Sequence, residues 1–294
     1  MLTLMHLYFM AHPRADERRV ATKPYNRAFL GPWRERLEEL GVKIETGTRV
    51  EGLVFEEGRV KGTKDEDYDY VILATDLPGQ KAILGASRGE DDLSEFLLEK
   101  VKSPIDKLKI ARPYKVMRVW FGGQLNASCP DILETPQHRP INLIAQYHLL
   151  EDEFAKWAQE TGGSVIEFHA YDLDEDLASV DTAEAWYEVL KPTVMEIYPD
   201  LGGFEVLGFS LNQYHNFPSF EKGQHAIRPD VEFPQKVGVG NLFFAGDWVQ
   251  TPFPSFIMER AVVTGRMAAN AVLRGERVRE VSVKVVNSRG PGLV

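Results

Sequence analysis

Residues 241–273 read NLFFAGDWVQTPFPSFIMERAVVTGRMAANAVL, and this stretch decides the fold class. It opens with an apolar run at 242–245, which predicts a buried strand. Gly246 and Asp247 end the strand, and a long helix rich in small residues is predicted over 255–273. In open α/β sheets, ligands bind beyond the carboxyl ends of strands, where the helices that follow point positive N-termini at anionic groups. The stretch therefore predicts an α/β fold with a ligand-binding edge, where the aspartate can accept hydrogen bonds from sugar or polyol hydroxyls.

A second buried strand is predicted earlier in the chain. Residues 71–74 read VILA and are apolar on both faces, as in a parallel strand covered by helices. Before it, residues 24–40 carry apolar side chains at helical spacing, which predicts an amphipathic helix. Short Val-rich and Ile-rich runs at 42–63, with a turn at Glu57-Gly58, predict a strand followed by a hairpin. The order expected is helix, strand, hairpin, buried strand.

The middle of the chain has a different character. The aromatic-rich runs at 116–123, 141–150 and 164–173 predict antiparallel strands, and 184–201 predicts a helix. Apolar and polar residues roughly alternate at 165–171, which is typical of a sheet covered on one face only. We expect this middle region to be laid against the rest.

Composition excludes several classes of function. Hydrophobic residues make up 44% of the 294, enough for a full core. The formal charge of −10 and the scattered Lys and Arg argue against a nucleic-acid partner. The single cysteine, Cys129, excludes an internal disulfide framework and fits a reducing cytosol. The seven histidines lack metal-binding spacing and no GxSxG nucleophile motif occurs, so we expect neither a metal site nor a hydrolase.

The two ends of the chain carry apolar residues. The opening MLTLMHLYFM is about half as long as a membrane span and lacks a basic leader and a cleavage site, so it predicts a strand or the start of a helix inside the fold. The closing run at 281–294 predicts a final edge strand. We expect a cytoplasmic protein whose membrane contact, if any, is peripheral.

The stretch at the C-terminal end resembles the FAD-dependent amine oxidase and phytoene desaturase superfamily. In that family the chain re-enters the FAD domain through a strand ending in Gly-Asp, then a loop, then a helix with a Met-Glu-x-Ala-x-x-x-Gly pattern. Here these parts are 243–247, 251–255, and Met258, Glu259, Ala261 and Gly265. Residues 30–76 resemble the family's middle FAD-domain segment, and the carotenoid-desaturase branch is the most similar.

The resemblance implies FAD as the cofactor and hydride transfer to FAD from an apolar polyene, which would be the small-molecule substrate. It assigns no catalytic residue. Asp76 stands where the family usually has a glycine or another small residue, which puts close backbone approach to the cofactor in doubt at that point. The residues that the resemblance implies at the cofactor are Gly246, Asp247, Thr251, Pro252, Pro254, Ser255, Met258 and Ala261.

One part of the family pattern is missing. The family begins with a strand, a GxGxxG turn and a helix that hold the ADP pyrophosphate, and the 294 residues contain no such motif. The resemblance thus implies an incomplete Rossmann-like FAD-binding domain, with 1–84 as its middle part and 236–294 as its C-terminal part. An antiparallel-sheet α+β substrate-binding region, 85–235, lies between them. We expect an exposed apolar surface, a partner chain or self-association where the missing segment would pack.

Two other interpretations stay open. The first is a non-catalytic, flavoprotein-like subunit or partner-docking scaffold that has lost FAD binding, which would be colourless. The second is an amine oxidase, which predicts an aromatic pair flanking the flavin and peroxide release with amines.

Overall fold

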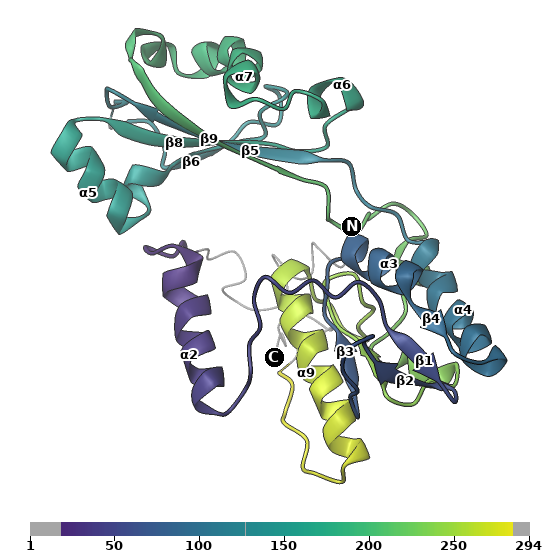
Figure 1. Cartoon of the computed structure of the whole chain (residues 1–294). Helices are drawn as coiled ribbons and strands as arrows, with labels where there is room; N and C mark the ends of the chain where they lie inside the picture. Colours follow the sequence, from purple (N-terminus) through teal and green to yellow (C-terminus); the bar gives the residue numbers. More distant parts are fainter. Residues whose placement is uncertain (1–18, 127, 285–294) are drawn as a thin grey trace, which may run out of the picture. The chain divides into compact units, whose positions relative to one another are not determined.

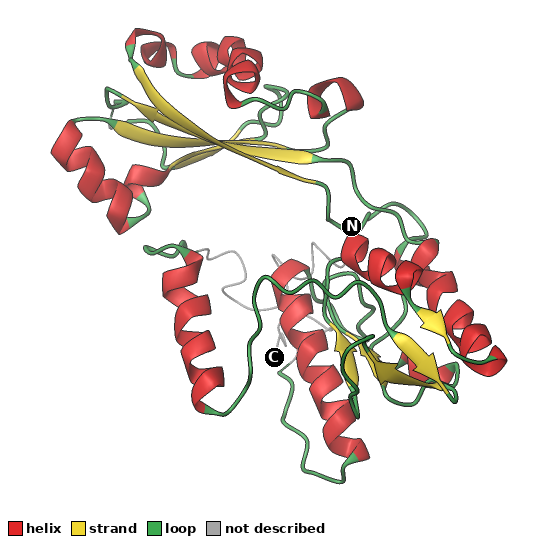
Figure 2. Cartoon of the chain, in the orientation of Figure 1, coloured by secondary structure: helices red, strands yellow, loops and turns green. Residues whose placement is uncertain are grey.

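The computed structural model describes residues 19–126 and 128–284, and these form two compact units (Figures 1 and 2). The first unit contains 47–111 and the described residues from 216 onward, and the second contains 19–46 and 112–215. The strand or helix start expected at 1–10 lies outside the described residues.

The first unit combines short sheets with helices. A parallel pair, β3 and β10, forms one sheet, and β1 pairs antiparallel with β2 and parallel with β4 in another. The α/β class predicted from the sequence is confirmed. The elements in chain order are β1 Val54–Glu56, β2 Arg59–Gly62, β3 Val71–Leu73, α3 Leu77–Ala86, β4 Arg88–Gly89, α4 Asp92–Asp106, η5 His225–Ile227, α8 Phe233–Lys236, β10 Leu242–Phe244 and α9 Ile257–Gly275.

The strand before the Gly-Asp pair is buried as predicted. All three residues of β10 are buried, and the backbone amide of Ala245 donates to the carbonyl of Leu73 at 3.0 Å. The expectation that β3 is buried on both faces is wrong, because Ile72 is 39% exposed. Its side chain lines an open groove on the edge of β3 that β10 does not occupy.

Asn241 anchors the β1–β2 hairpin to β10. Its side chain is 6% exposed, its Oδ1 accepts from the Val60 amide at 3.0 Å, and its Nδ2 donates to the Val60 carbonyl at 2.7 Å. The same Nδ2 donates to the Asp69 carbonyl at 3.1 Å. One buried amide group therefore satisfies backbone groups of Val60 and Asp69, which lie 181 and 172 residues before it in the sequence.

The hairpin expected at 42–63 is confirmed, but the strand expected before it is not. Glu57 and Gly58 have φ of 51° and 73°, the left-handed pair that a tight two-residue hairpin turn requires. Residues 42–50 form no strand, and Val42 and Val50 are 45% and 42% exposed, so this run buries no face that would fix it in a sheet. Residues 281–284 form no strand either, and 285–294 lie outside the described residues.

The second unit is built on a sheet with strand order β6-β7-β8-β5-β9, antiparallel at every pairing. This confirms the antiparallel region and the helix predicted in the middle of the chain. Helices α6 and α7 lie on one side of the sheet and α5 on the other (Figure 1). The elements are η2 Asn26–Leu30, α2 Gly31–Glu39, β5 Tyr114–Phe121, β6 Ile132–Glu134, β7 Leu143–Gln146, η3 Tyr147–Leu149, α5 Asp152–Thr161, β8 Ser164–Ala170, α6 Glu175–Ala178, α7 Ala183–Ile197, η4 Pro199–Gly203 and β9 Val206–Tyr214.

The two faces of this sheet differ. Alternate residues of β5 are fully buried, and Met117 and Val119 form one core with Trp186 and Leu190 of α7. The expectation that β8 is covered on one face only is wrong, because six of its seven residues are buried. Both faces are covered: on the face that carries Glu167, Val165 is fully buried, and Glu167 itself is enclosed by its ion-pair partners Arg118 and His169.

The amphipathic helix predicted over 24–40 is confirmed as η2 followed by α2. It belongs to the second unit, and its apolar face stays exposed, with Trp33 at 55% and Leu40 at 62%. The boundaries of the two units differ from those of the predicted segments 1–84, 85–235 and 236–294. Helix α4 is one reason, because it packs its apolar side on the core of the first unit.

No helix within 19–126 and 128–284 reaches the length and apolar content that crossing a membrane needs.

Replacing Asn241 with alanine should lower the free energy of unfolding by about 2–3 kcal/mol, because buried backbone groups of Val60 lose their partner. Urea titration followed by circular dichroism measures the change. The exposed Asn212 of β9 provides the matched control, whose alanine variant should stay within about 0.5 kcal/mol of the parent chain. Equal stability of the two variants would contradict the anchoring role of Asn241.

Candidate functional site

The Gly-Asp turn after β10 is held in a conformation that only glycine accepts easily. Gly246 has φ of 138°, and its amide donates to Thr264 Oγ1 of α9 at 2.9 Å. A Cβ at this position would lie 2.8 Å from Trp248 Nε1 and 3.1 Å from the Thr75 carbonyl oxygen. Glycine is thus required where the turn passes between β3 and α9.

Asp247 follows this turn and is partly buried. Burial raises the pKa of its carboxyl above the ordinary value, and the positive charges of Arg228 and Arg260 oppose that shift only in part. A carboxylate in this position is short of stabilising contacts. Hydroxyl groups that donate to it would supply them.

Two guanidinium groups stand beside the aspartate. Arg228 and Arg260 are each 4% exposed, and their Nη1 atoms donate to the Asp247 backbone carbonyl at 3.5 and 3.4 Å. Burial, and then the neighbouring charge of Arg260, lowers the pKa of Arg228 to about 10. Two buried cations lie beside one acid here, and an anionic or electron-rich ligand would be stabilised next to them.

Sequence reasoning missed both arginines. Arg260 stands directly before Ala261 in the quoted helix motif, on the face that carries the buried Val263 and Thr264. For Arg260, the signal available in the sequence was a charged residue on the face of the helix that is otherwise buried. Arg228 precedes a proline in an irregular segment, where no periodicity marks a buried side chain.

The loop between the turn and α9 is tied down by its own hydroxyls. Thr251 and Ser255 are 7% and 1% exposed, and their hydroxyl oxygens lie 2.7 Å apart in a hydrogen bond. Arg260 Nε donates to Ser255 Oγ at 3.2 Å. Two of the residues expected at the cofactor therefore shape the loop, whereas Pro252 and Met258 are exposed and free to meet a ligand.

The N-cap residue of helix α9, Phe256, is extended and its own side chain makes no capping hydrogen bond. Ile257 has φ of 47°, a strained value for a β-branched residue. The helix dipole favours negative charge at this end, and Glu259 lies in the first turn. Small residues let the helix pack closely, with Ala268 fully buried and Ala261 partly buried.

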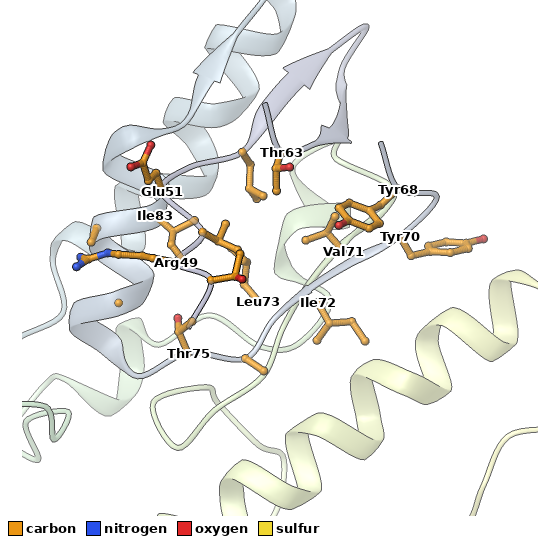
Figure 3. A pocket seen from close by; sticks show the side chains of 16 residues that line it. Arg49, Glu51, Thr63, Tyr68, Tyr70, Val71, Ile72, Leu73, Thr75 and Ile83 are labelled. Atoms are coloured by element: carbon orange, nitrogen blue, oxygen red, sulfur yellow. The ribbon is translucent and has the colours of Figure 1, made fainter. Parts of the chain in front are cut away.

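An open groove of about 710 Å³ runs along β3, on the edge where no other strand of residues 19–126 and 128–284 pairs with it (Figure 3). Tyr68, Val71 and Leu73 line it along the strand, and Ile83 of α3 and Arg49 close its other side. At the carboxyl end of β3 it reaches Thr75, whose carbonyl accepts from Trp248 Nε1 at 3.0 Å. The groove is an open, mainly apolar surface. The partner chain or self-association expected from the sequence stays a prediction.

Asp76, the second acidic residue near the carboxyl ends of the strands, has a structural role. Asp76 caps α3, because its Oδ1 accepts from the Gly79 amide at 2.8 Å. Across residues 19–126 and 128–284, no three His, Cys, Asp or Glu side chains are arranged to hold a metal ion.

Comparison with known proteins identifies a family for this chain. The sequence pattern of the family described as "Flavin containing amine oxidoreductase" matches residues 26–273. A carotenoid phi-ring synthase of Chlorobaculum tepidum is 31% identical over 223 residues, which are 76% of this chain and 32% of that protein. A carotenoid phi-ring synthase of Streptomyces griseus is 28% identical over 295 residues, covering 99% of this chain and 54% of that protein. The chain therefore spans about a third and about half of the lengths of these two relatives.

Solved structures show the same fold. An oxidoreductase from Methanosarcina mazei superposes with a TM-score of 0.51 at 19% identity, covering 85% of this chain and 54% of that one. Cyclohexylamine oxidase from Brevibacterium oxydans superposes with a TM-score of 0.52 at 14% identity, covering 78% of this chain and 48% of that one. The family match over 26–273 contains both the β3 segment and the Gly-Asp turn with α9, so the resemblance seen in the sequence is confirmed: the chain belongs to the flavin-containing amine oxidoreductase family, which includes the carotenoid desaturases.

Proposed function

We propose that this chain forms the middle and C-terminal parts of an FAD-dependent oxidoreductase that takes hydride from a carotenoid-like polyene. The observation that carries the proposal is the partly buried Asp247 carboxylate beside two buried arginines, in the loop before helix α9. The two curated relatives are carotenoid phi-ring synthases, which supports a carotenoid as the substrate class.

The residues of the turn fit the polyol arm of FAD. Ribityl hydroxyls donating to Asp247 would offset the desolvation that now raises the pKa of this carboxyl. Gly246 adopts the backbone conformation that turns the chain after β10 and sets Asp247 beside α9. The proposed contact residues are Gly246, Asp247, Thr251, Pro252, Pro254, Ser255, Met258 and Ala261, with Thr251 and Ser255 acting by holding the loop in shape.

The charges of the site suit an electron acceptor. Bound FAD would supply the hydride-accepting nitrogen of its ring, and the protein has to supply position, dryness and charge stabilisation. Arg228, Arg260 and the first-turn amides of α9 are positive groups that are already in place, so they need no rearrangement when negative charge develops beside them. A polyene offers mainly apolar area for binding, worth about 25 cal/mol per Å² buried.

We further propose that the β3 groove receives the strand that carries the nucleotide-binding GxGxxG turn, supplied from outside these 294 residues or by a partner chain. Within the part of the chain that the structure describes, β3 pairs only with β10, so a parallel strand could be added along the edge of β3 that faces the groove. The apolar lining of the groove would be covered by the same event.

FAD binding should depend on Asp247. The chain supplied with FAD, together with the GxGxxG-bearing segment where binding requires it, should turn yellow and show flavin absorption. Asp247→Ala should weaken FAD binding roughly 10- to 100-fold, the worth of a charge-assisted hydrogen bond. Asp65→Asn, at an exposed turn of the same unit, is the control. A parent chain that stays colourless under both conditions would favour the non-catalytic scaffold instead.

In the absence of FAD, the ionised Asp247 carboxylate should lower the free energy of unfolding. Because folding raises its pKa, the folded state holds this proton more tightly, so the unfolding free energy should fall as the pH rises from 3.8 through the raised value. Asp247→Asn removes the ionisation and should be more stable by about 0.5–1 kcal/mol at neutral pH. Urea titrations across this range, with Asp65→Asn alongside, measure the effect. A parent chain that gains stability with rising pH relative to Asp247→Asn would refute the desolvation argument.

The free groove should bind apolar dyes and favour self-association. Ile72→Lys should reduce dye fluorescence by about half and shift the chain towards monomer in analytical ultracentrifugation. Unfolding free energy should change by no more than about 0.5 kcal/mol, because this side chain is already exposed. The equally exposed Ile132 of β6, at 41%, is the control. A strictly monomeric parent chain that binds no dye would speak against an open groove.

A further inference from the structure

Strand β9 forms one edge of the five-stranded sheet in the second unit. It runs over nine residues, Val206–Tyr214, and pairs antiparallel with β5. Within residues 19–126 and 128–284, no strand pairs with its other edge. In an antiparallel sheet a strand turns about half of its backbone N–H and C=O groups to each side, so half of those groups in β9 face away from β5.

The two edges of this sheet are built differently. The opposite edge is β6, which has only three residues. The residues in and around β6 include two prolines and two acids, Pro130, Asp131, Glu134 and Pro136. Short length, charge and proline are the usual means by which proteins prevent an edge strand from pairing with another chain. Strand β9 reads VLGFSLNQY and has no charged residue and no proline, so this edge lacks that protection.

Most of β9 has a regular register. A shift occurs between the partners of Trp120 and Phe121, near the start of β9, and from Gly208 to Tyr214 every residue has one partner in β5. Leu211 is the midpoint of these seven residues. Two copies of β9 related by a twofold axis at Leu211 would therefore pair along the whole regular segment. This register also places α7 of both copies on the same side of the joined sheet, because residues of the same face lie opposite each other.

The side chains of the segment suit this register. Gly208 would lie opposite Tyr214 of the second copy, and a Cβ at Gly208 would meet no atom of the described residues within 4 Å, which leaves space for an aromatic ring. Ser210 would lie opposite Asn212, and both are exposed polar side chains that can hydrogen-bond across the strands. The chain has a formal charge of −10, but no charged side chain of the segment meets another at this contact.

We propose that β9 is a dimerisation edge, on which the β9 of a second copy of this chain pairs antiparallel about a twofold axis at Leu211. The two five-stranded sheets then form one continuous sheet. The proposal goes beyond the proposed function, since neither FAD nor a substrate takes part in this contact. It also concerns a different surface from the β3 groove, which belongs to the first unit.

Disulfide cross-linking tests the contact and its register together. In a chain whose single cysteine is removed by Cys129→Ala, Leu211→Cys should give a disulfide-linked dimer under mild oxidation. Directly opposite residues of antiparallel strands have Cα atoms about 4.5–5.5 Å apart, which a disulfide can bridge. Gln213→Cys is the matched control, because the two copies of residue 213 would be offset by four residues, about 13 Å along the strand, and should not cross-link.

A charged residue on the edge gives a second test that leaves the core of the sheet unchanged. Asn212 is exposed, and Asn212→Lys places a lysine on the pairing edge of each copy. This substitution should weaken the dimer at least about 10-fold in analytical ultracentrifugation, because an edge lysine opposes strand pairing. Ile132→Lys on the opposite edge is the control and should stay within about twofold. Both are measured in a chain that also carries Ile72→Lys, so that the β3 groove does not contribute.

Each outcome decides about β9 alone. Cross-linking at 211 but not at 213, together with a dimer that Asn212→Lys weakens, supports the proposal. Equal cross-linking at 211 and 213, a dimer that Asn212→Lys does not weaken, or a chain with Ile72→Lys that is monomeric at every concentration overturns it. None of these measurements involves FAD, so their failure leaves the proposed function intact, and a chain that binds no FAD leaves the β9 dimer intact.

Discussion

The desolvated carboxylate of Asp247 is the constraint on which the site depends. The chain can hold it there because two arginines, Arg228 and Arg260, clamp its backbone carbonyl and partly neutralise its charge. The neighbouring residues hold it in this position. Gly246 allows the turn, and Thr264 joins the turn to α9 by a hydrogen bond. Thr251 and Ser255 hold the loop by a hydrogen bond between their hydroxyl groups. The arrangement is stabilised only in part by the protein itself. A ligand with donating hydroxyls would complete it.

The polar groups of the two units are arranged differently. Beside β10 the first unit offers fixed positive groups and an acid, which suit a cofactor that takes up electrons. On the sheet of the second unit, Glu167 is enclosed by Arg118 and His169, which bond to its two carboxylate oxygens.

Local patterns in the sequence predicted the elements whose burial is periodic. Strand β10, helix α9 and the antiparallel strands β5 and β8 follow from runs of apolar residues and from turn residues, which act over short distances. The errors have a long-range cause. Burial of β3 depends on what packs on its second edge, a strand at 42–50 needs a partner to pair with, and the enclosure of Glu167 depends on Arg118 from another strand. Arg228 was missed for the same reason, since nothing near it in sequence marks it as buried.

An experimental structure of the chain with FAD bound would decide whether Asp247 holds the cofactor. We expect an Asp247 carboxylate oxygen within about 2.6–3.2 Å of a ribityl hydroxyl oxygen, with the first turn of α9 facing the flavin ring. A structure in which FAD lies elsewhere, or in which this carboxylate points into water with no ribityl contact, would contradict this expectation.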